Sequence, residues 1–219
     1  MTEPTNTQLI LASGSPRRQE FLIRLGLPYT VQVANIDETP LASEAPAAIA
    51  RRLAEQKAQA VAAQIPQANA LIIAADTVVA LGDESLGKPA TPAEAEEMLI
   101  KLRNRAHQVI TAVSVLHCAS KTQRTRLNTT DVYMRDYQAD EIAAYIATGD
   151  PFDKAGGYAI QHPQFAPVSR IAGCLSGVIG LPLGDLVGLL AEFGVSVSRN
   201  LAPICQQQSS FTCCSTHNG

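Results

Sequence analysis

The chain has 219 residues, 46% of them hydrophobic, which is enough for one sizeable domain with its own core. Its 17 basic and 20 acidic residues give a formal charge of -3, so we expect no attraction to a nucleic-acid polymer or an anionic membrane. A polar start and the lack of any apolar run of about 18 residues predict a cytoplasmic protein without a signal peptide or membrane span. The five cysteines are too unevenly placed for a disulfide framework.

Strand and helix patterns alternate along the first half of the chain. Short apolar runs predict strands, and stretches with apolar residues at every third or fourth position predict helices. This alternation favours a layered α/β fold. The predicted strands cover 9–12, 29–34 and 71–80, and the predicted helices cover 15–25, 47–63 and 93–102.

Two more strands are expected in the second half, and they should pair antiparallel through a polar connection. Together with the first half this predicts a mixed sheet. Two helices follow, the first closed by a Gly-Asp-Pro sequence and the second opened by Gly-Leu-Pro. The strands cover 109–117 and 125–134, and the helices cover 140–147 and 183–193.

The periodic pattern stops near residue 196. The last residues are rich in Gln, Ser, Thr and Cys and offer little to bury. The sequence therefore predicts one domain over 1–195 and a disordered tail over 196–219.

The segment 13–18, Ser-Gly-Ser-Pro-Arg-Arg, joins the first strand to the first helix. Ser15 is expected to cap the helix, and Pro16 suits its first position. Arg17 and Arg18 then lie where the positive end of the helix dipole disfavours cations. A bound anion such as phosphate would remove this conflict, since backbone N–H groups and guanidinium groups both bind it. Two solvated surface arginines are an equally good interpretation of this segment alone.

Two charged residues interrupt apolar patterns. Lys57 falls within the apolar face of the second helix, where it needs an anionic partner or must extend its ammonium to the rim. Asp76 lies inside an apolar strand pattern, and a buried carboxylate is costly unless it is paired, hydrogen-bonded or bound to a metal. Backbone amides are an alternative partner for Asp76, with Thr77 capping a bend. Asp37 and Glu38 follow the second strand and supply carboxylates that suit a hard cation such as Mg²⁺.

The segment 82–89, Gly-Asp-Glu-Ser-Leu-Gly-Lys-Pro, approaches a P-loop but does not form one. Pro89 replaces the Ser or Thr whose hydroxyl binds Mg²⁺, and a helix cannot continue through the residue before a proline. Lys88 is instead expected to be a loop cation directed at phosphate.

A second loop, 150–161, combines charges that include Lys154, two adjacent glycines and the amide of Gln161. Glycines allow a backbone to approach a ligand closely. Gly-rich turns are common, so this segment alone is a weak indication of a site.

Taken together, these segments resemble the Maf family of nucleotide pyrophosphatases over about residues 8–195. The resemblance implies an elongated α/β fold with a mixed sheet flanked by helices and a nucleotide cleft between two lobes. It also implies metal-assisted attack of water on the α-phosphorus of a nucleoside triphosphate, with Mg²⁺ or Mn²⁺ as cofactor and pyrophosphate as product. The matching motifs occur in order as Leu-Ala-Ser-Gly-Ser-Pro-Arg-Arg at 11–18, Ala-Asp-Thr at 75–77, Gly-Lys-Pro at 87–89, Asp-Lys-Ala-Gly-Gly-Tyr-Ala-Ile-Gln at 153–161 and Gly-Leu-Pro-Leu at 180–183.

The resemblance also implies roles for individual residues. Asp76 matches the proton acceptor of the family and, with Glu38, the acidic positions near the metal. Lys57 and Lys88 match cations that hold phosphates. Arg17, Thr77 and Gln161 match the positions that divide the family by base, and this combination resembles the dTTP/UTP branch rather than the 7-methyl-GTP branch. The residues expected to bind substrate or set specificity are Arg17, Arg18, Lys57, Thr77, Lys88, Lys154 and Gln161.

One polyphosphate with its metal would explain Arg17 near the helix dipole, Lys57 in an apolar stripe and Asp76 in an apolar strand. Two alternatives stay open: the same chemistry on 7-methyl-GTP or another modified nucleotide, and a nucleotide-sensing regulator of cell division without turnover. A homodimer also stays open. The segment 162–176 and Ile179 depart from the family pattern, which leaves fine substrate preference undetermined.

Overall fold

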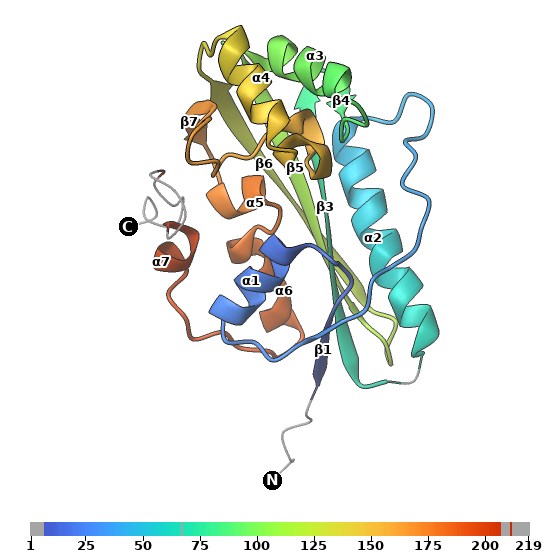
Figure 1. The fold of residues 1–219 in the computed structure, drawn as a ribbon. Helices are drawn as coiled ribbons and strands as arrows, with labels where there is room; N and C mark the ends of the chain where they lie inside the picture. Colours follow the sequence, from blue (N-terminus) through green and yellow to red (C-terminus); the bar gives the residue numbers. More distant parts are fainter. Residues whose placement is uncertain (1–6, 67, 207–210, 212–219) are drawn as a thin grey trace.

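The computed structural model describes residues 7–66, 68–206 and 211, and its centre is one mixed sheet of seven strands (Figure 1). The strands are β1 (Gln8–Leu11), β2 (Thr30–Val31), β3 (Ala70–Leu81), β4 (Glu84–Leu86), β5 (Ala106–His117), β6 (Gln123–Met134) and β7 (Val168–Ala172). Their order is β2-β1-β3-β5-β6-β7, with β4 paired to β3. β1 is parallel to β2 and β3, and the other pairs are antiparallel. The predicted mixed α/β sheet is confirmed.

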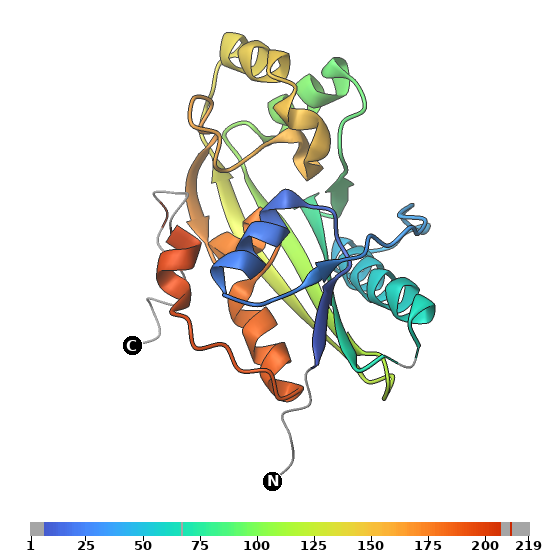
Figure 2. The ribbon, with the colours of Figure 1, turned by 60° about the horizontal axis from the view of Figure 1, so that its bottom comes forward.

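Helices flank the sheet on both faces, as Figures 1 and 2 show from two directions. They are α1 (Pro16–Arg24), α2 (Pro46–Gln64), α3 (Pro92–Leu102), α4 (Ala139–Ala147), α5 (Leu175–Ile179), α6 (Leu183–Glu192) and α7 (Leu201–Gln206), with 3₁₀ turns η1 (Asp150–Asp153) and η2 (Ala155–Gly157). In the described part of the chain, no helix combines the length and the apolar character that a membrane span requires.

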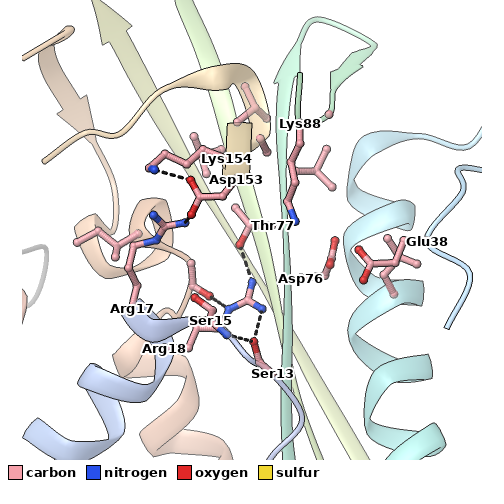
Figure 3. Close-up of a pocket in the computed structure, with 18 of the residues that line it drawn as sticks. Ser13, Ser15, Arg17, Arg18, Glu38, Asp76, Thr77, Lys88, Asp153 and Lys154 are labelled. Carbon is pink, nitrogen blue, oxygen red and sulfur yellow. Dashed lines mark hydrogen bonds and ion pairs between the residues drawn. The ribbon is translucent and has the colours of Figure 1, made fainter. Parts of the chain in front are cut away.

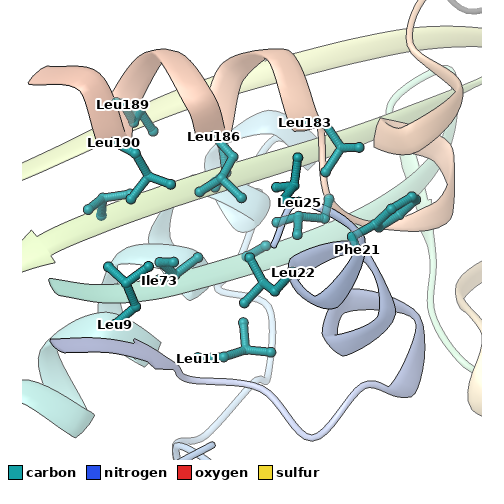
Figure 4. Packing of buried hydrophobic residues seen from close by; sticks show 14 of the residues in the cluster. Leu9, Leu11, Phe21, Leu22, Leu25, Ile73, Leu183, Leu186, Leu189 and Leu190 are labelled. Atoms are coloured by element: carbon teal, nitrogen blue, oxygen red, sulfur yellow. The ribbon is translucent and has the colours of Figure 1, made fainter. Parts of the chain in front are cut away.

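One face of β3 packs against α1 and α6 (Figure 4). Because side chains alternate along a strand, the odd-numbered residues of β3 point to this face. Leu71 and Ile73 meet Leu22 of α1 and Leu186 of α6, and all four are fully or almost fully buried. Leucines from three elements thus fix α1 against the sheet, and with it the loop that precedes α1.

The opposite face of β3 packs against α2. Even-numbered residues of β3, such as Ile72, belong to this face. The helix presents small side chains at every fourth position, which lets its axis lie close to the sheet. This close packing determines where the longer side chains of α2 reach the sheet. The buried alanines of α2 are Ala50, Ala54, Ala58 and Ala62.

A third cluster lies where β5 and β6 reach α3 and α4, at the top of Figure 1. Tyr137 and Tyr145 are almost completely buried in it, and the ring of Tyr145 stacks on Phe165 with centroids 4.4 Å apart. The segments η1 and η2 belong to this part of the molecule. We call it the upper lobe, and the part built on α1, α2 and α6 the lower lobe.

Several elements differ from the sequence prediction. The second strand has only two residues, both exposed, rather than 29–34. The short elements β4, β7, α5, η1 and η2 were not predicted, because each is too short to show a period. Ser15 lies at the N-cap of α1, but its side chain makes no capping hydrogen bond.

The predicted tail is corrected at one point, because residues 201–206 form α7. Cys205 of this helix is buried, and Leu201 and Ile204 pack against the core of the lower lobe. A helix of six residues carries too few apolar residues to show a helical period in the sequence. Most of the remaining predicted tail, residues 207–210 and 212–219, lies outside the described residues.

Candidate active site

The candidate site lies where β3 has no neighbouring strand along part of one edge. On this edge β1 ends opposite Ile73, and β4 begins opposite Val79. The other edge is paired with β5 throughout. In the described structure, residues 74–78 therefore border an opening, and a cavity of about 690 Å³ occupies it. Neighbouring residues of a strand point to opposite faces, so the opening lets one cavity reach both Asp76 and Thr77.

On the α2 face of the sheet lies a cluster that we call the carboxylate side, formed by Glu38, Lys57 and Asp76. The Lys57 ammonium is 2.6 Å from Asp76 Oδ1 and 3.0 Å from Glu38 Oε1. Lys57 and Asp76 are 8% and 7% exposed, so they form a buried ion pair. The Glu38 carboxylate lies beside this pair and is more exposed. The anionic partner expected for Lys57 is thus present in the protein itself.

Burial raises the pKa of Asp76, because the ionised carboxylate loses solvation. The charge and hydrogen bond of Lys57 oppose this shift, and Arg18 opposes it from further away. A carboxylate with a raised pKa is a stronger proton acceptor than an ordinary aspartate. The alternative of backbone amides holding Asp76 is not what the structure contains, since its hydrogen-bond partner is Lys57.

Lys88 lies above the carboxylate side and is exposed, and Figure 3 shows its side chain pointing toward Asp76. Within the described residues its ammonium makes no ion pair or hydrogen bond, unlike those of Lys57 and Lys154. An exposed cation at the mouth of the cavity is available to an anionic ligand, and the expectation that Lys88 meets phosphate stays a prediction.

On the opposite face lies what we call the hydroxyl side, formed by Ser13, Arg18, Thr77 and, behind them, Thr111. The Arg18 guanidinium donates to the Gly180 carbonyl at 2.8 Å, to Ser13 Oγ at 3.2 Å and to Thr77 Oγ1 at 3.3 Å. These protein acceptors resolve the dipole conflict at Arg18 without a bound anion. Ser13 Oγ also accepts from the backbone N–H of residue 15 and so organises the loop.

The rim of the cavity carries a contact between the two lobes. Arg17 Nη2 of α1 is 3.7 Å from Asp153 Oδ2 of η1 (Figure 3). Lys154 lines the cavity, but its ammonium binds Asp150 through the backbone oxygen at 2.7 Å and Oδ1 at 2.8 Å, and also contacts Asp153. Lys154 therefore holds η1 in shape, and Arg17 is the more exposed of the two cations.

The first of the two adjacent glycines, Gly156, lets η2 pack closely against the sheet. Gly156 has φ +70°, and a Cβ there would come within 2.9 Å of Val79 Cγ1. Its N–H donates to the Gly87 carbonyl at 2.9 Å. A side chain at this position would therefore push η2 away from β3 and β4.

The next residue to enter the cavity wall, Tyr158, is held by a buried histidine. His107 Nε2 lies 2.7 Å from Tyr158 Oη, and burial lowers the pKa of His107 to about 4. His107 is therefore neutral near pH 7. Since it comes from β5, it ties the loop that leads to Gln161 to the central sheet.

The residues to which the family resemblance gives a role all line this one cavity. Asp37 does not line it, because its carboxylate accepts from the Thr39 N–H at 2.9 Å. Sequence reasoning missed Ser13, Asp153 and Thr111 as members of the site. Ser13 and Asp153 lie inside the motifs, but Thr111 has no sequence signal, because threonine is ordinary in a strand. The predicted residues that line the cavity are Arg17, Arg18, Glu38, Lys57, Asp76, Thr77, Lys88, Lys154 and Gln161.

The carboxylate side fits a divalent cation only in part. Among the described residues no group of three or more His, Cys, Asp or Glu side chains forms a metal site. Asp76 and Glu38 nevertheless both contact Lys57, so their oxygens face the same space. Mg²⁺ is often held by one or two carboxylates and completed by substrate phosphates. The two carboxylates suit that arrangement and do not suit a cage made by protein alone.

Comparison with known proteins gives consistent matches over most of the chain. The family model described as Maf-like protein matches residues 8–193. A dTTP/UTP pyrophosphatase of Pelotomaculum thermopropionicum is 42% identical over 190 residues, covering 87% of this chain and 98% of that protein. A protein of the same name from Thermomicrobium roseum is 46% identical over 204 residues, 91% and 92% of the two chains. One from Myxococcus xanthus is 46% identical over 189 residues, 86% and 94%.

Proposed function

This chain belongs to the Maf-like protein family, and we propose that it is a nucleoside triphosphate pyrophosphatase that hydrolyses dTTP and UTP. The observation that carries the proposal is the buried Asp76, which faces a cavity lined by cations and lies in contact with Lys57. The products are the nucleoside monophosphate and pyrophosphate.

Asp76 is the group that removes a proton from water in this proposal. The water oxygen forms a bond to the α-phosphorus while the bond from that phosphorus to the bridging oxygen breaks, and pyrophosphate departs with the bridging oxygen. The proton passes to Asp76. Burial raises the pKa of this carboxyl, which strengthens it as a base, and the charge of Lys57 opposes that rise and favours the ionised form.

The cations around the cavity give the substrate its orientation. Lys88 is exposed at the mouth and suits the terminal phosphates. Glu38 and Asp76 are the residues that would hold Mg²⁺ or Mn²⁺. Such an ion would neutralise charge on the phosphate oxygens. The nucleoside then extends toward Thr77, Arg17 and Gln161, which line the rest of the cavity.

Pyrophosphate release from a panel of nucleotides tests this proposal. UTP, dTTP, CTP, GTP and 7-methyl-GTP are assayed with Mg²⁺ or Mn²⁺, and we expect kcat/KM to be highest for UTP and dTTP. Equal values for UTP and GTP would contradict the base preference, and a preference for 7-methyl-GTP would favour the alternative substrate. Binding without pyrophosphate release under either metal would favour a sensor.

The position of attack is tested separately with ¹⁸O-labelled water. Attack on the α-phosphorus places the label in the monophosphate. Label found in pyrophosphate or in inorganic phosphate would contradict the proposed reaction even if the nucleotide is consumed.

A further inference from the structure

Behind the cavity wall, a chain of hydrogen bonds runs from a backbone carbonyl to Thr77. Thr111 of β5 is 1% exposed, and its Oγ1 donates to the Gly177 carbonyl at 2.8 Å. The same Oγ1 lies 2.9 Å from Thr77 Oγ1. Thr77 also receives the 3.3 Å hydrogen bond from Arg18 Nη2.

The direction of each bond in this chain follows from the chemistry of the groups. A carbonyl can only accept, so the single hydroxyl proton of Thr111 goes to Gly177. In the contact between the two hydroxyls, Thr77 must therefore donate and Thr111 accept. A guanidinium can only donate, so Arg18 occupies one lone pair of Thr77. Thr77 keeps one lone pair and no proton for a ligand.

We propose that Thr111 is a specificity-determining positioning residue, which makes Thr77 an obligatory hydrogen-bond acceptor toward the nucleobase. The inference rests on the proposed function, because it names what the same cavity selects. The imide N–H of uracil and thymine is a donor and matches this acceptor. The corresponding ring nitrogen of cytosine carries no proton, so it would face the lone pair of Thr77 with its own lone pair.

The layout of the cavity brings the base to Thr77. The carboxylate side and Lys88 lie on one side of β3, and Thr77 points to the other side with Arg17 and Arg18 (Figure 3). A triphosphate held by the exposed cation and the carboxylates must therefore direct its nucleoside across the open edge of β3. Thr77 is partly exposed there, whereas Thr111 is covered and acts only through it.

The primary test measures kcat/KM for UTP and CTP in the wild type, Thr111→Val and Thr111→Ser. Valine keeps the size but removes the hydroxyl, so the Thr77 proton is released and can turn to the ligand. We expect the wild type to prefer UTP and the ratio of UTP to CTP to fall about tenfold in Thr111→Val, the scale of one hydrogen bond. Thr111→Ser keeps the hydroxyl and should keep the ratio.

Thr130→Val is the matched control. Thr130 of β6 is also 1% exposed and also hydrogen-bonds a backbone carbonyl, that of Cys174, but its hydroxyl hydrogen-bonds Asn128 and Cys174 and not Thr77. Its valine variant loses a buried hydroxyl as well, so it reports the general cost to stability. It should leave the UTP to CTP ratio unchanged.

A second measurement needs only the wild type, which covers the case of a variant that does not fold. The pH profile of kcat/KM is compared for UTP and for 6-aza-UTP, whose ring N–H is more acidic. Once this N–H ionises it can no longer donate, so we expect the alkaline loss of 6-aza-UTP turnover to begin at lower pH. Coincident profiles would overturn the proposal, as would an unchanged UTP to CTP ratio in a folded Thr111→Val.

Calorimetric binding of UTP and CTP separates this inference from the proposed function. Suppose that no nucleotide is hydrolysed but UTP binds more tightly than CTP in a way that depends on Thr111. Then the role of Thr77 as a hydrogen-bond acceptor stands, and the proposed hydrolysis is wrong. If UTP and CTP are hydrolysed and bound equally, the reaction stands and the role of Thr111 is wrong.

Discussion

The carboxylate side and the hydroxyl side of the cavity start from neighbouring residues of one strand and work by different physics. Asp76 points to α2 and meets a buried ammonium at 2.6 Å, so its state depends on charge, desolvation and pH. Thr77 points to α1 and belongs to a chain of bonds that ends on the carbonyls of Gly177 and Gly180. Its state depends on geometry and has no titratable step near pH 7.

This difference suggests a division of labour within the cavity. A side that responds to charge suits a reaction in which charge develops and a proton moves. A side that is fixed by directional hydrogen bonds suits recognition of a base whose donors and acceptors do not change. The break in the edge of β3 is what allows both to meet one ligand.

Asp76→Asn should produce the largest effect. The amide is nearly isosteric but cannot accept the proton, so we expect kcat to fall by about 10²–10⁴, with any loss of metal affinity added to it. Melting should change little, because the Lys57 ammonium keeps Glu38 as a carboxylate partner at 3.0 Å and the asparagine oxygen can still accept its hydrogen bond. Asp83→Asn, in the exposed turn between β3 and β4, is the control. Wild-type kcat at saturating UTP and metal would exclude the catalytic role.

Lys57→Met should lower kcat/KM near pH 7 by about 10–100-fold and move the acid limb of the pH profile upward. The reaction needs ionised Asp76, and activity is lost as pH falls through its pKa. Lys57 lowers that pKa, so without the ammonium the pKa rises further and the loss begins at higher pH. Lys101→Met removes an exposed ammonium paired with Glu84 and should leave the profile unchanged. An acid limb that stays in place would show that Asp76 does not control it.

Glu38→Gln should mainly change the metal dependence. The Glu38 side chain is 54% exposed and loses only one contact to Lys57, so folding should be preserved. We expect the concentration of Mg²⁺ for half-maximal activity to rise about tenfold, a change typical of the surroundings of a metal site. Asp37→Asn is the neighbouring control, because Asp37 does not line the cavity. A lower kcat at saturating metal with unchanged metal dependence would assign Glu38 another role.

The long helices and strands could be predicted from the sequence because their apolar residues recur at a regular period. The charged residues of the site could be predicted because they interrupt that period. β3 and α2 give clear patterns, and Lys57 and Asp76 interrupt them. The prediction that a ligand explains both was incomplete, since they are also each other's partner. That pairing depends on the separation of α2 from the sheet, which a pattern of buried alanines permits but does not specify.

Two kinds of feature could not be predicted from the sequence: short helices and strands, and residues such as Thr111 that act on the cavity through another side chain. The helix α7 has only six residues, too few to show a period. Thr111 matters only because β5 places it beside Thr77 and beneath Gly177, three residues far apart in the sequence. Assigning Arg18 to phosphate follows naturally from its place in α1, whereas the structure supplies three protein acceptors.

Asp153→Asn should give the smallest effect and tests the contact that joins the two lobes at the rim. Arg17 and Asp153 are 36% and 66% exposed and 3.7 Å apart, and such a surface pair contributes at most about 1 kcal/mol. Asparagine keeps an oxygen for Lys154 but releases Arg17 to the substrate. We therefore expect KM for UTP to fall by at most about fivefold at low salt, and by less at high salt, where surface charges are screened. Melting should hardly change.

The control for this variant is Asp136→Asn, because Asp136 pairs with Arg103 at 3.9 Å with exposures of 35% for the arginine and 65% for the aspartate. The two pairs thus match in distance and exposure and differ in that only Arg17 and Asp153 line the cavity. An unchanged KM at both salt concentrations would mean that Arg17 does not meet the substrate. A higher KM would mean that Asp153 holds the two lobes in the binding geometry, and that the rim contact helps the substrate to bind rather than competing with it.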